Sequence, residues 1–282
     1  MPRRFSIGLV VLAFIACFSS CIGDPRMAAQ SHMKRWRAAE FSSDPLGVRL
    51  AEAVAAGNRS GIDSLVHEGA DVNLRGKEGL PLLVWAMAKD SAEGFDALLA
   101  HGADLTALAN DPAFTRNGER TRQVIELVVS AFNSEFLRAS LKHGFDPDYV
   151  PDPGMNESLL FRAVWTHAID NAAILLDAGA DIDHVDANNE SAIMLAAGMR
   201  YYEMVVFLLG RGADPCIKAR SGHDLAGCLK MFGDRGVTVQ EAPHFRKVVA
   251  ELKKRGLITD EDIAKANQPG PPPPWEEGGI NP

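Results

Sequence analysis

The sequence predicts an all-α solenoid, a stack of five to six degenerate helix-turn-helix repeats joined by short loops. A phrase of two apolar residues, two variable residues and Gly-Ala-Asp occurs at 65–71, 98–104, 175–181 and 208–214, with a worn copy at 141–146. The glycines of the first two copies are 33 residues apart, as are those of the last two. The intervening steps, through Gly144, are 42 and 35 residues. A fixed period in this range is typical of stacked repeats.

Each part of the phrase has a physical role. The two apolar residues end an amphipathic helix that packs on the next repeat. The glycine takes a left-handed conformation that stops the helix without a Cβ clash. The aspartate accepts hydrogen bonds from nearby backbone N–H groups and holds the turn. Upstream, the small residues Ala53, Ala163 and Ala196 each lie 16 positions before a phrase glycine, which predicts a first helix that packs closely in every repeat.

Two segments resemble the signature of a known repeat family. Ser191–Ala197, which reads SAIMLAA, resembles the ankyrin Thr-Pro-Leu-His-x-Ala-Ala motif, and Leu80–Ala86 is a looser match. Pro81 is the only proline at the expected place, and the signature histidine is absent. The resemblance covers residues 46–257 and implies an ankyrin-repeat solenoid whose loops form short β-fingers. The expected finger segments are 74–78, 106–122, 147–156, 184–189 and 217–222.

The first 21 residues are typical of a bacterial export signal. Arg3 and Arg4 precede a 14-residue apolar run, 5–18. This run is shorter than the ~20 residues that span a membrane and fits a secretory signal. Phe18-Ser19-Ser20-Cys21 resembles a lipobox, which implies lipidation of Cys21. Cys17 is the other candidate for processing, and an uncleaved anchor is the alternative to cleavage. We therefore expect a periplasmic protein, lipid-anchored to the cell envelope, with the retaining membrane left open.

The flanks of the repeat region differ from it in composition. Residues 22–45 mix Pro, Ser, Met and charged residues, and we interpret them as a tether that leads into a short helix. Residues 258–267 predict a polar capping helix that begins at Thr259 with an acidic first turn. Residues 268–282 are rich in Pro and Gly, which predicts a disordered tail with polyproline II conformation at 271–274.

The charge balance restricts the class of partner. The chain has 29 basic and 37 acidic residues and a net charge of −8. This balance argues against nucleic-acid binding, which needs cations against phosphates, and against direct adhesion to anionic lipid. A basic protein partner fits better, because opposite fields speed encounter. The alternative is that the charge serves only solubility.

No catalytic or metal-binding constellation is evident. The sequence has no His-Glu-x-x-His, Gly-x-Ser-x-Gly, P-loop or dinucleotide-binding motif. His101 and His143 occupy the same place in successive repeats, but neighbouring helix layers lie ~8–10 Å apart, too far to share a zinc ion with ~2.0–2.1 Å bonds. The aspartates of the phrase recur in identical phase, which indicates turn capping. We expect no enzyme activity, no metal and no cofactor.

Two cysteines remain after the expected signal segment. Cys216 follows the last phrase, and Cys228 lies in the next expected helix. An even number of cysteines in an exported chain permits a disulfide. The bridge requires Cα atoms within ~7 Å, which the sequence does not establish. Two separate thiols are the alternative.

The concave face of the stack, made by first helices and finger tips, is the expected binding surface. Tyr, Trp, Met and Arg concentrate binding energy at interfaces. The candidates on this face are Met87, Arg162, Trp165, Leu195, Met199 and Tyr201. The candidates on the fingers are Arg75, Lys77, His184, Asn188, Lys218 and Arg220. The alternative for Trp165 and Met199 is that they fill irregular packing between unequal repeats.

The resemblance and the missing catalytic motifs together imply a non-enzymatic, membrane-anchored periplasmic module that binds another protein. The sharpest form of this hypothesis is an immunity protein that neutralises a secreted toxin or effector. The alternative is a scaffold or adaptor for envelope enzymes such as stress-defence proteins. The identity of the partner and the oligomeric state stay open.

Overall fold

A computed structural model of the chain describes residues 35–109, 122–232, 237–238 and 240–266. The predicted signal peptide, the predicted lipidation site Cys21 and the predicted tail at 268–282 lie outside these residues, as does most of the 106–122 finger. The described residues divide into two compact units. The first holds residues 35–94 and Ala109, and the second holds residues 95–108 together with those from Arg122 onward.

The first unit is built around one long helix. Its elements in chain order are α3 (Ala38–Phe41), α4 (Pro45–Ala55), α5 (Arg59–His67), the 3-10 turn η1 (Lys77–Gly79) and α6 (Leu82–Ala88). Helix α4 contacts α3, α5 and α6. Asp44 caps α4, because its side chain accepts a hydrogen bond of 2.7 Å from the backbone N–H of Gly47. The first repeat helix is therefore present, and it begins one residue before the predicted start of the repeat region at residue 46.

The end of the predicted tether is part of this packed unit. Phe41 of α3 is 1% exposed, and its ring centroid lies 5.0 Å from that of Trp85. The Trp85 indole in turn donates a hydrogen bond of 2.9 Å to the backbone oxygen of Ala51. Helix α3 is the short helix that was expected at the end of the tether, and it belongs to the packed unit because it contacts α4 and buries the Phe41 ring against Trp85.

The second unit continues the pairing. Helix α7 (Ala92–Ala100) and strand β1 (Leu108–Ala109) cross the boundary between the units, and β1 pairs with β2 (Arg122–Gln123) in a two-stranded sheet. The helix pairs that follow are α8 (Val124–Val129) with α9 (Glu135–Lys142), α10 (Leu159–Trp165) with α11 (Ile169–Asp177), α12 (Ala192–Gly198) with α13 (Tyr202–Gly210), and α14 (Leu225–Phe232) with α15 (Ala242–Lys254). Helix α16 (Asp260–Ala266) comes last.

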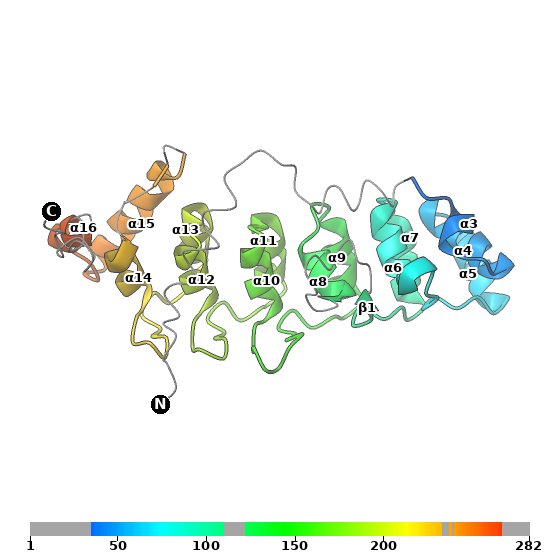
Figure 1. The fold of residues 1–282 in the computed structure, drawn as a ribbon, viewed down its shortest axis with the longest axis horizontal. Helices are drawn as coiled ribbons and strands as arrows, with labels where there is room; N and C mark the ends of the chain where they lie inside the picture. The colour runs from blue at the N-terminus through cyan, green and yellow to red at the C-terminus, as the bar shows by residue number, and fades with distance from the viewer. Residues whose placement is uncertain (1–34, 110–121, 233–236, 239, 267–282) are drawn as a thin grey trace, which may run out of the picture. The chain divides into compact units, whose positions relative to one another are not determined.

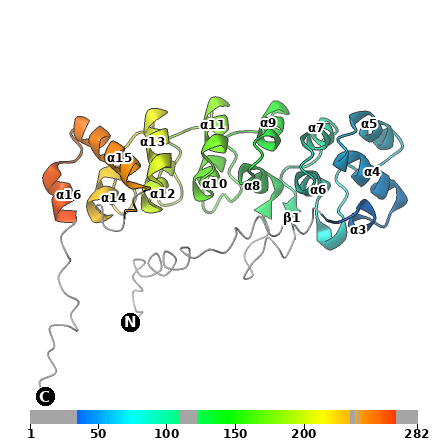
Figure 2. The same ribbon diagram turned by 90° about the horizontal axis from the view of Figure 1, so that it is seen from above.

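Within the second unit, neighbouring pairs lie side by side in sequence order (Figures 1 and 2). The first helices α8, α10, α12 and α14 contact one another in that order, and α16 contacts α14. Among the second helices, α9 contacts α11 and α13 contacts α15. Counted along the chain, the described residues hold six helix pairs, α4/α5 and α6/α7 included. The predicted fold class, paired helices joined by short loops, is confirmed.

The five phrase glycines end second helices as predicted. Their φ angles lie between 82° and 101°, in the left-handed region. The residue after each glycine donates its N–H to the carbonyl five positions back, as Ala213 does to Leu208 at 3.0 Å. This is the Schellman arrangement, which satisfies carbonyls that the helix leaves unpaired.

The phrase aspartates hold the turns that follow. Asp214 Oδ1 accepts a hydrogen bond of 2.8 Å from the N–H of Cys216. The same contact, two residues ahead, recurs at 2.8–3.0 Å for Asp71, Asp104, Asp146 and Asp181. The turn-capping interpretation of these aspartates is therefore confirmed.

A buried amide connects two repeats of the second unit. Asn171 of α11 is 1% exposed. Its Nδ2 donates hydrogen bonds to the backbone oxygens of Val129, at 2.8 Å, and Ala131, at 2.9 Å. These carbonyls lie at the C-terminal end of α8, where a helix leaves acceptors unsatisfied. Asn171 thus fixes the position of one repeat on the one before it.

Replacing Asn171 with Leu should destabilise the protein by about 2 kcal/mol, because two buried carbonyls lose their donor while the volume is nearly kept. Urea unfolding followed by circular dichroism measures this loss. Asp170→Asn, at an exposed position of the same helix, is the control and should change stability by less than about 0.5 kcal/mol. Equal unfolding midpoints for the Leu variant and the wild type would contradict the role given to Asn171.

Candidate functional site

The loops before the first helices form finger-like turns. Antiparallel bridges join Arg75 to Pro81 and Val185 to Ser191. In the second unit, adjacent fingers are hydrogen-bonded to one another. The Ala187 N–H donates to the Met155 carbonyl at 2.9 Å, and the Arg220 N–H donates to the Asn188 carbonyl at 2.8 Å. Backbone hydrogen bonds therefore join the fingers at 147–156, 184–189 and 217–222 to one another.

The predicted finger residues divide by what they contact. In the first unit, Arg75 donates to the Gly79 carbonyl at 2.9 Å, and the Lys77 ammonium lies 5.1 Å from the centre of the Trp36 ring. In the second unit, the His184 Nε2 lies 2.8 Å from the Asn156 carbonyl oxygen, so this side chain connects two fingers. The side chains of Asn188, Lys218 and Arg220 are exposed.

Carboxylates gather where the first helices of the second unit begin. We call Glu157, Asp186, Glu190 and Asp224 the acidic row. Glu157 and Glu190 are 33 residues apart and directly precede the N-caps of α10 and α12. Burial raises the pKa of Glu157, a hydrogen bond with Trp165 opposes the rise, and the charge of Asp186 adds to it. Burial and the charge of Asp186 also raise the pKa of Glu190. The row therefore concentrates negative charge that the fold itself only partly compensates.

Large apolar side chains are exposed near the opposite ends of the same helices. We call Phe132, Trp165 and Met231 the apolar row. They are 74%, 43% and 49% exposed. Phe132 follows α8, Trp165 is the last residue of α10 and Met231 is the penultimate residue of α14. Arg162, on α10, donates a hydrogen bond of 2.8 Å to the Ser130 hydroxyl at the end of α8. Together, the two rows and Arg162 form what we call the first-helix face.

The predicted concave-face residues have different environments. Arg162, Leu195 and Met199 are half-buried, on or at the end of first helices, and Trp165 is exposed. The Tyr201 ring stacks on that of His167, with centroids 4.5 Å apart. Met87 needs correction. It is 8% exposed, because α6 is buried along its whole length and none of its side chains faces solvent.

Six residues of the first-helix face escaped the sequence interpretation, namely Phe132, Glu157, Asp186, Glu190, Asp224 and Met231. The period was an available signal for two of them. Met231 lies two 33-residue periods after Trp165, and Glu190 lies one period after Glu157. No comparable signal marked Phe132, because the loop that carries it departs from the repeat pattern.

Among the described residues, no three His, Cys, Asp or Glu side chains are grouped so that they could hold a metal ion. No helix in the same ranges combines the length and the apolar character needed to cross a membrane. The His143 Nε2 lies 2.9 Å from the Asp96 carboxylate, which also pairs with Lys142 at 2.9 Å. His143 therefore belongs to an ion-pair cluster that joins α7 and α9.

Both cysteines of the repeat region are free thiols. Cys216 is exposed, and Cys228 is partly buried on α14. Burial, together with the nearby charges of Glu190 and Asp224, raises the pKa of Cys228 to about 11. Of the two alternatives that the sequence left open, the structure contains the separate thiols.

Iodoacetamide should alkylate both thiols of the native protein at pH 8 without prior reduction. Cys216 should react roughly 10–100-fold faster, because Cys228 is partly buried and its raised pKa leaves little reactive thiolate. Intact-mass and peptide mass spectrometry over time measure the two rates. A protein that takes up label only after reduction would contain the disulfide instead.

Comparison with known proteins agrees with this geometry. The family model for ankyrin repeats (many copies) matches residues 167–209. An ankyrin repeat-containing protein of Treponema pallidum (strain Nichols) is 27% identical over 146 residues, which are 50% of this chain and 48% of that protein. The chain thus matches about half the length of that curated relative.

Two solved structures share the fold. The ankyrin repeat domain of Bcl-3 superposes with a TM-score of 0.54 at 24% identity, covering 74% of this chain and 86% of that one. An ankyrin repeat domain from Acinetobacter baumannii AYE gives a TM-score of 0.50 at 20% identity, covering 64% of this chain and 89% of that one.

These findings and the glycine-ended helix pairs define a helical repeat protein with finger-like loops. More particularly, the chain is an ankyrin-repeat protein, and its described residues form a mostly helical ankyrin-repeat domain with paired helices and short loops.

Proposed function

We propose that the protein is a non-enzymatic recognition module that binds another protein through the first-helix face. Ankyrin-repeat domains are generally non-catalytic binding modules. The observation that carries the proposal is the apolar row, three large apolar side chains that remain 43–74% exposed on a packed helical array. Exposed apolar groups rimmed by polar ones mark interaction surfaces, and Trp is strongly enriched among residues that dominate binding energy.

The charges of this face specify the chemistry of the partner. The pKa values of Glu157 and Glu190 are raised, so ionising these carboxylates is costly in the free protein. A cation brought against them would stabilise their charged forms. The partner that fits is therefore a protein whose contact surface combines lysine or arginine with apolar side chains.

We further propose that this partner is a secreted toxin or effector and that the protein acts as an immunity protein in the periplasm, anchored to the cell envelope. The support for this role is the signal-like start of the sequence with its lipobox-like end, together with the acidic face. An inhibitor that is held in the compartment where its target folds or passes needs fast association, and opposite fields provide it.

Affinity purification with the full chain, from the envelope fraction of the native organism, should retain a basic protein in stoichiometric amount. Trp165→Ala should weaken that complex at least about 30-fold, equivalent to ~2 kcal/mol, because a central aromatic contact is lost. Calorimetry or interferometry with the purified partner measures the change. Phe207→Ala, on the second helix α13, is the matched control and should bind as the wild type does.

The activity of the captured protein distinguishes the roles. Loss of its hydrolytic activity in the complex supports immunity. Several partners that keep their activity indicate a scaffold instead. Unchanged affinity of the Trp165 variant, with the fold intact by circular dichroism, would exclude the first-helix face as the binding surface.

The substitutions Glu157→Gln and Glu190→Gln should each increase the stability of the free protein and decrease its affinity for the basic partner. A raised pKa in the folded state means that the folded protein holds the proton more tightly than the unfolded chain does. The contribution of each carboxyl group to the free energy of unfolding therefore falls as pH rises through the raised pKa. The Gln variants should therefore be more stable at pH 7, by up to about 0.5 kcal/mol, but should bind the basic partner more weakly. The wild-type complex should weaken as pH falls through the raised pKa values, and the double Gln variant should lack this dependence. Urea unfolding and binding assays between pH 4 and 8 test both effects.

A further inference from the structure

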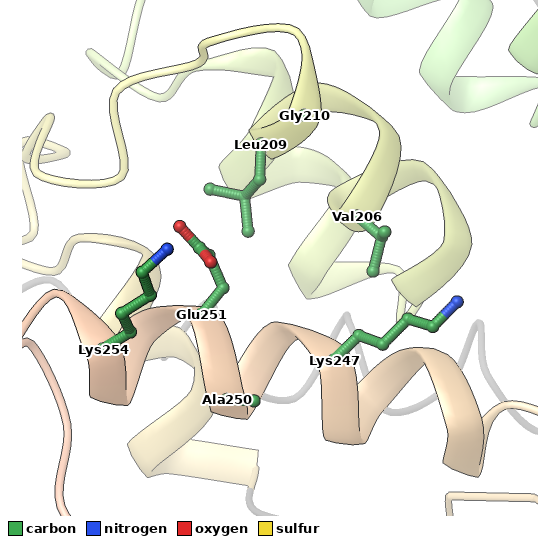
Figure 3. A pocket seen from close by; sticks show the side chains of 7 residues that line it. All are labelled: Val206, Leu209, Gly210, Lys247, Ala250, Glu251 and Lys254. Carbon is green, nitrogen blue, oxygen red and sulfur yellow. The ribbon is translucent and has the colours of Figure 1, made fainter.

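A groove lies between the second helices α13 and α15, away from the first-helix face. Its volume is about 490 Å³. Val206, Leu209 and Gly210 line it from α13, and Ala250 lies opposite on α15. In Figure 3 the side chains of Lys247 and Lys254 stand at its two ends, with the apolar side chains of α13 facing the gap between them. The groove therefore has apolar side chains on its α13 side and, on its α15 side, a cation at each end with Glu251 between them.

The groove is open because the repeat pattern changes at Gly210. The residue two positions before the phrase glycine is Lys142 in one repeat and Asp177 in the next, and both form ion pairs with a neighbouring repeat. Gly210 stands at this position in the following repeat and has no side chain to contribute. A Cβ added there would meet no atom within 4 Å.

The cations at the two ends of the groove are available to a ligand. In the described part of the chain, no ion pair is formed by Lys247 or Lys254. Glu251, which lies between them, pairs with Arg255 at 2.8 Å. A ligand that suits the groove would therefore combine a large apolar group with neighbouring acidic groups.

We propose that residues 267–282 of the same chain occupy this groove. Trp275 contacts Val206, Leu209 and Ala250, and the carboxylates of Glu276 and Glu277 pair with the two lysines. The segment contains the required chemistry in one place, since Trp275-Glu276-Glu277 follows four consecutive prolines. The proposal does not depend on the first-helix face, so either can fail without the other.

The segment starts close enough to reach. Asp260, the first residue of α16, pairs with Lys253, the neighbour of Lys254. Helix α16 comprises seven residues and ends at Ala266, a length of ~10 Å. Nine further residues lead to Trp275, and an extended chain of that length spans up to ~30 Å. Because residues 267–282 are covalently linked to α16, their effective concentration at the groove is in the millimolar range, which favours them over an occupant from solution.

Fluorine NMR of the full chain labelled with 5-fluorotryptophan tests the contact. The chain has four tryptophans, so Trp275→Phe assigns the resonance of interest by its loss. We expect the Trp275 resonance to be displaced from the free fluoroindole position and protected from a soluble paramagnetic agent. Gly210→Leu, which fills the groove, should abolish both effects, as should Lys247→Glu combined with Lys254→Glu.

Matched controls separate occupancy from misfolding. Gly198→Leu adds the same side chain at another helical glycine with open space beside it, and Arg246→Glu reverses an exposed charge of α15 outside the groove. Both should leave the Trp275 resonance displaced. Glu276→Lys with Glu277→Lys should release Trp275. Combining these two changes with both lysine reversals should restore the displacement.

Three outcomes would overturn the proposal. One is a Trp275 resonance at the free position in the wild type that no groove variant moves. Another is a displacement that vanishes on dilution, which would make a second copy of the chain the occupant. The third is a displacement that arises only after another protein is added.

Discussion

Each second helix ends at a glycine whose left-handed backbone would cost an L side chain ~1–2 kcal/mol. The carbonyls at that end are satisfied by the residue after the glycine, and the turn is then held by the aspartate one position further on. Because this arrangement recurs with nearly constant spacing, every repeat leaves its second helix in the same direction. Neighbouring first helices contact one another, and so form the first-helix face, only because the chain leaves each second helix in the same direction.

The parts of the structure that repeat were predictable from sequence, and the parts that occur once were not. Phrase glycines and aspartates are marked by their phase, so their roles follow from the repeat spacing alone. A short helix was expected at the end of the tether, but the packing of α3 was not predictable, because four residues without a repeat partner carry no periodic signal that would place Phe41 against Trp85. Similarly, Met87 was assigned by analogy to a solvent-facing position, whereas α6 is covered on every side.

The first helices also end in ways that sequence rules do not anticipate. Asp90, His167 and Arg200 have φ angles of 54–63° without being glycine. His167, in the turn between α10 and α11, stacks on Tyr201, in the turn between α12 and α13. This strained turn is therefore stabilised by a side chain of the next repeat. The exposure of Trp165 and the raised pKa values of Glu157 and Glu190 also lower stability at the first-helix face, as the recognition role proposed for it would require.

The hydrogen bonds between neighbouring fingers recur from one repeat to the next. Asp148 and Asp183 each accept a backbone N–H from the repeat that follows, at 2.7 and 2.9 Å, while the Ala187 and Arg220 amides join the same fingers. The Ala187 and Arg220 amides are one 33-residue period apart, and so are the Met155 and Asn188 carbonyls that accept from them. Gene duplication or loss can therefore lengthen or shorten such an array by a complete period and still leave each finger beside a neighbour whose backbone groups match its own.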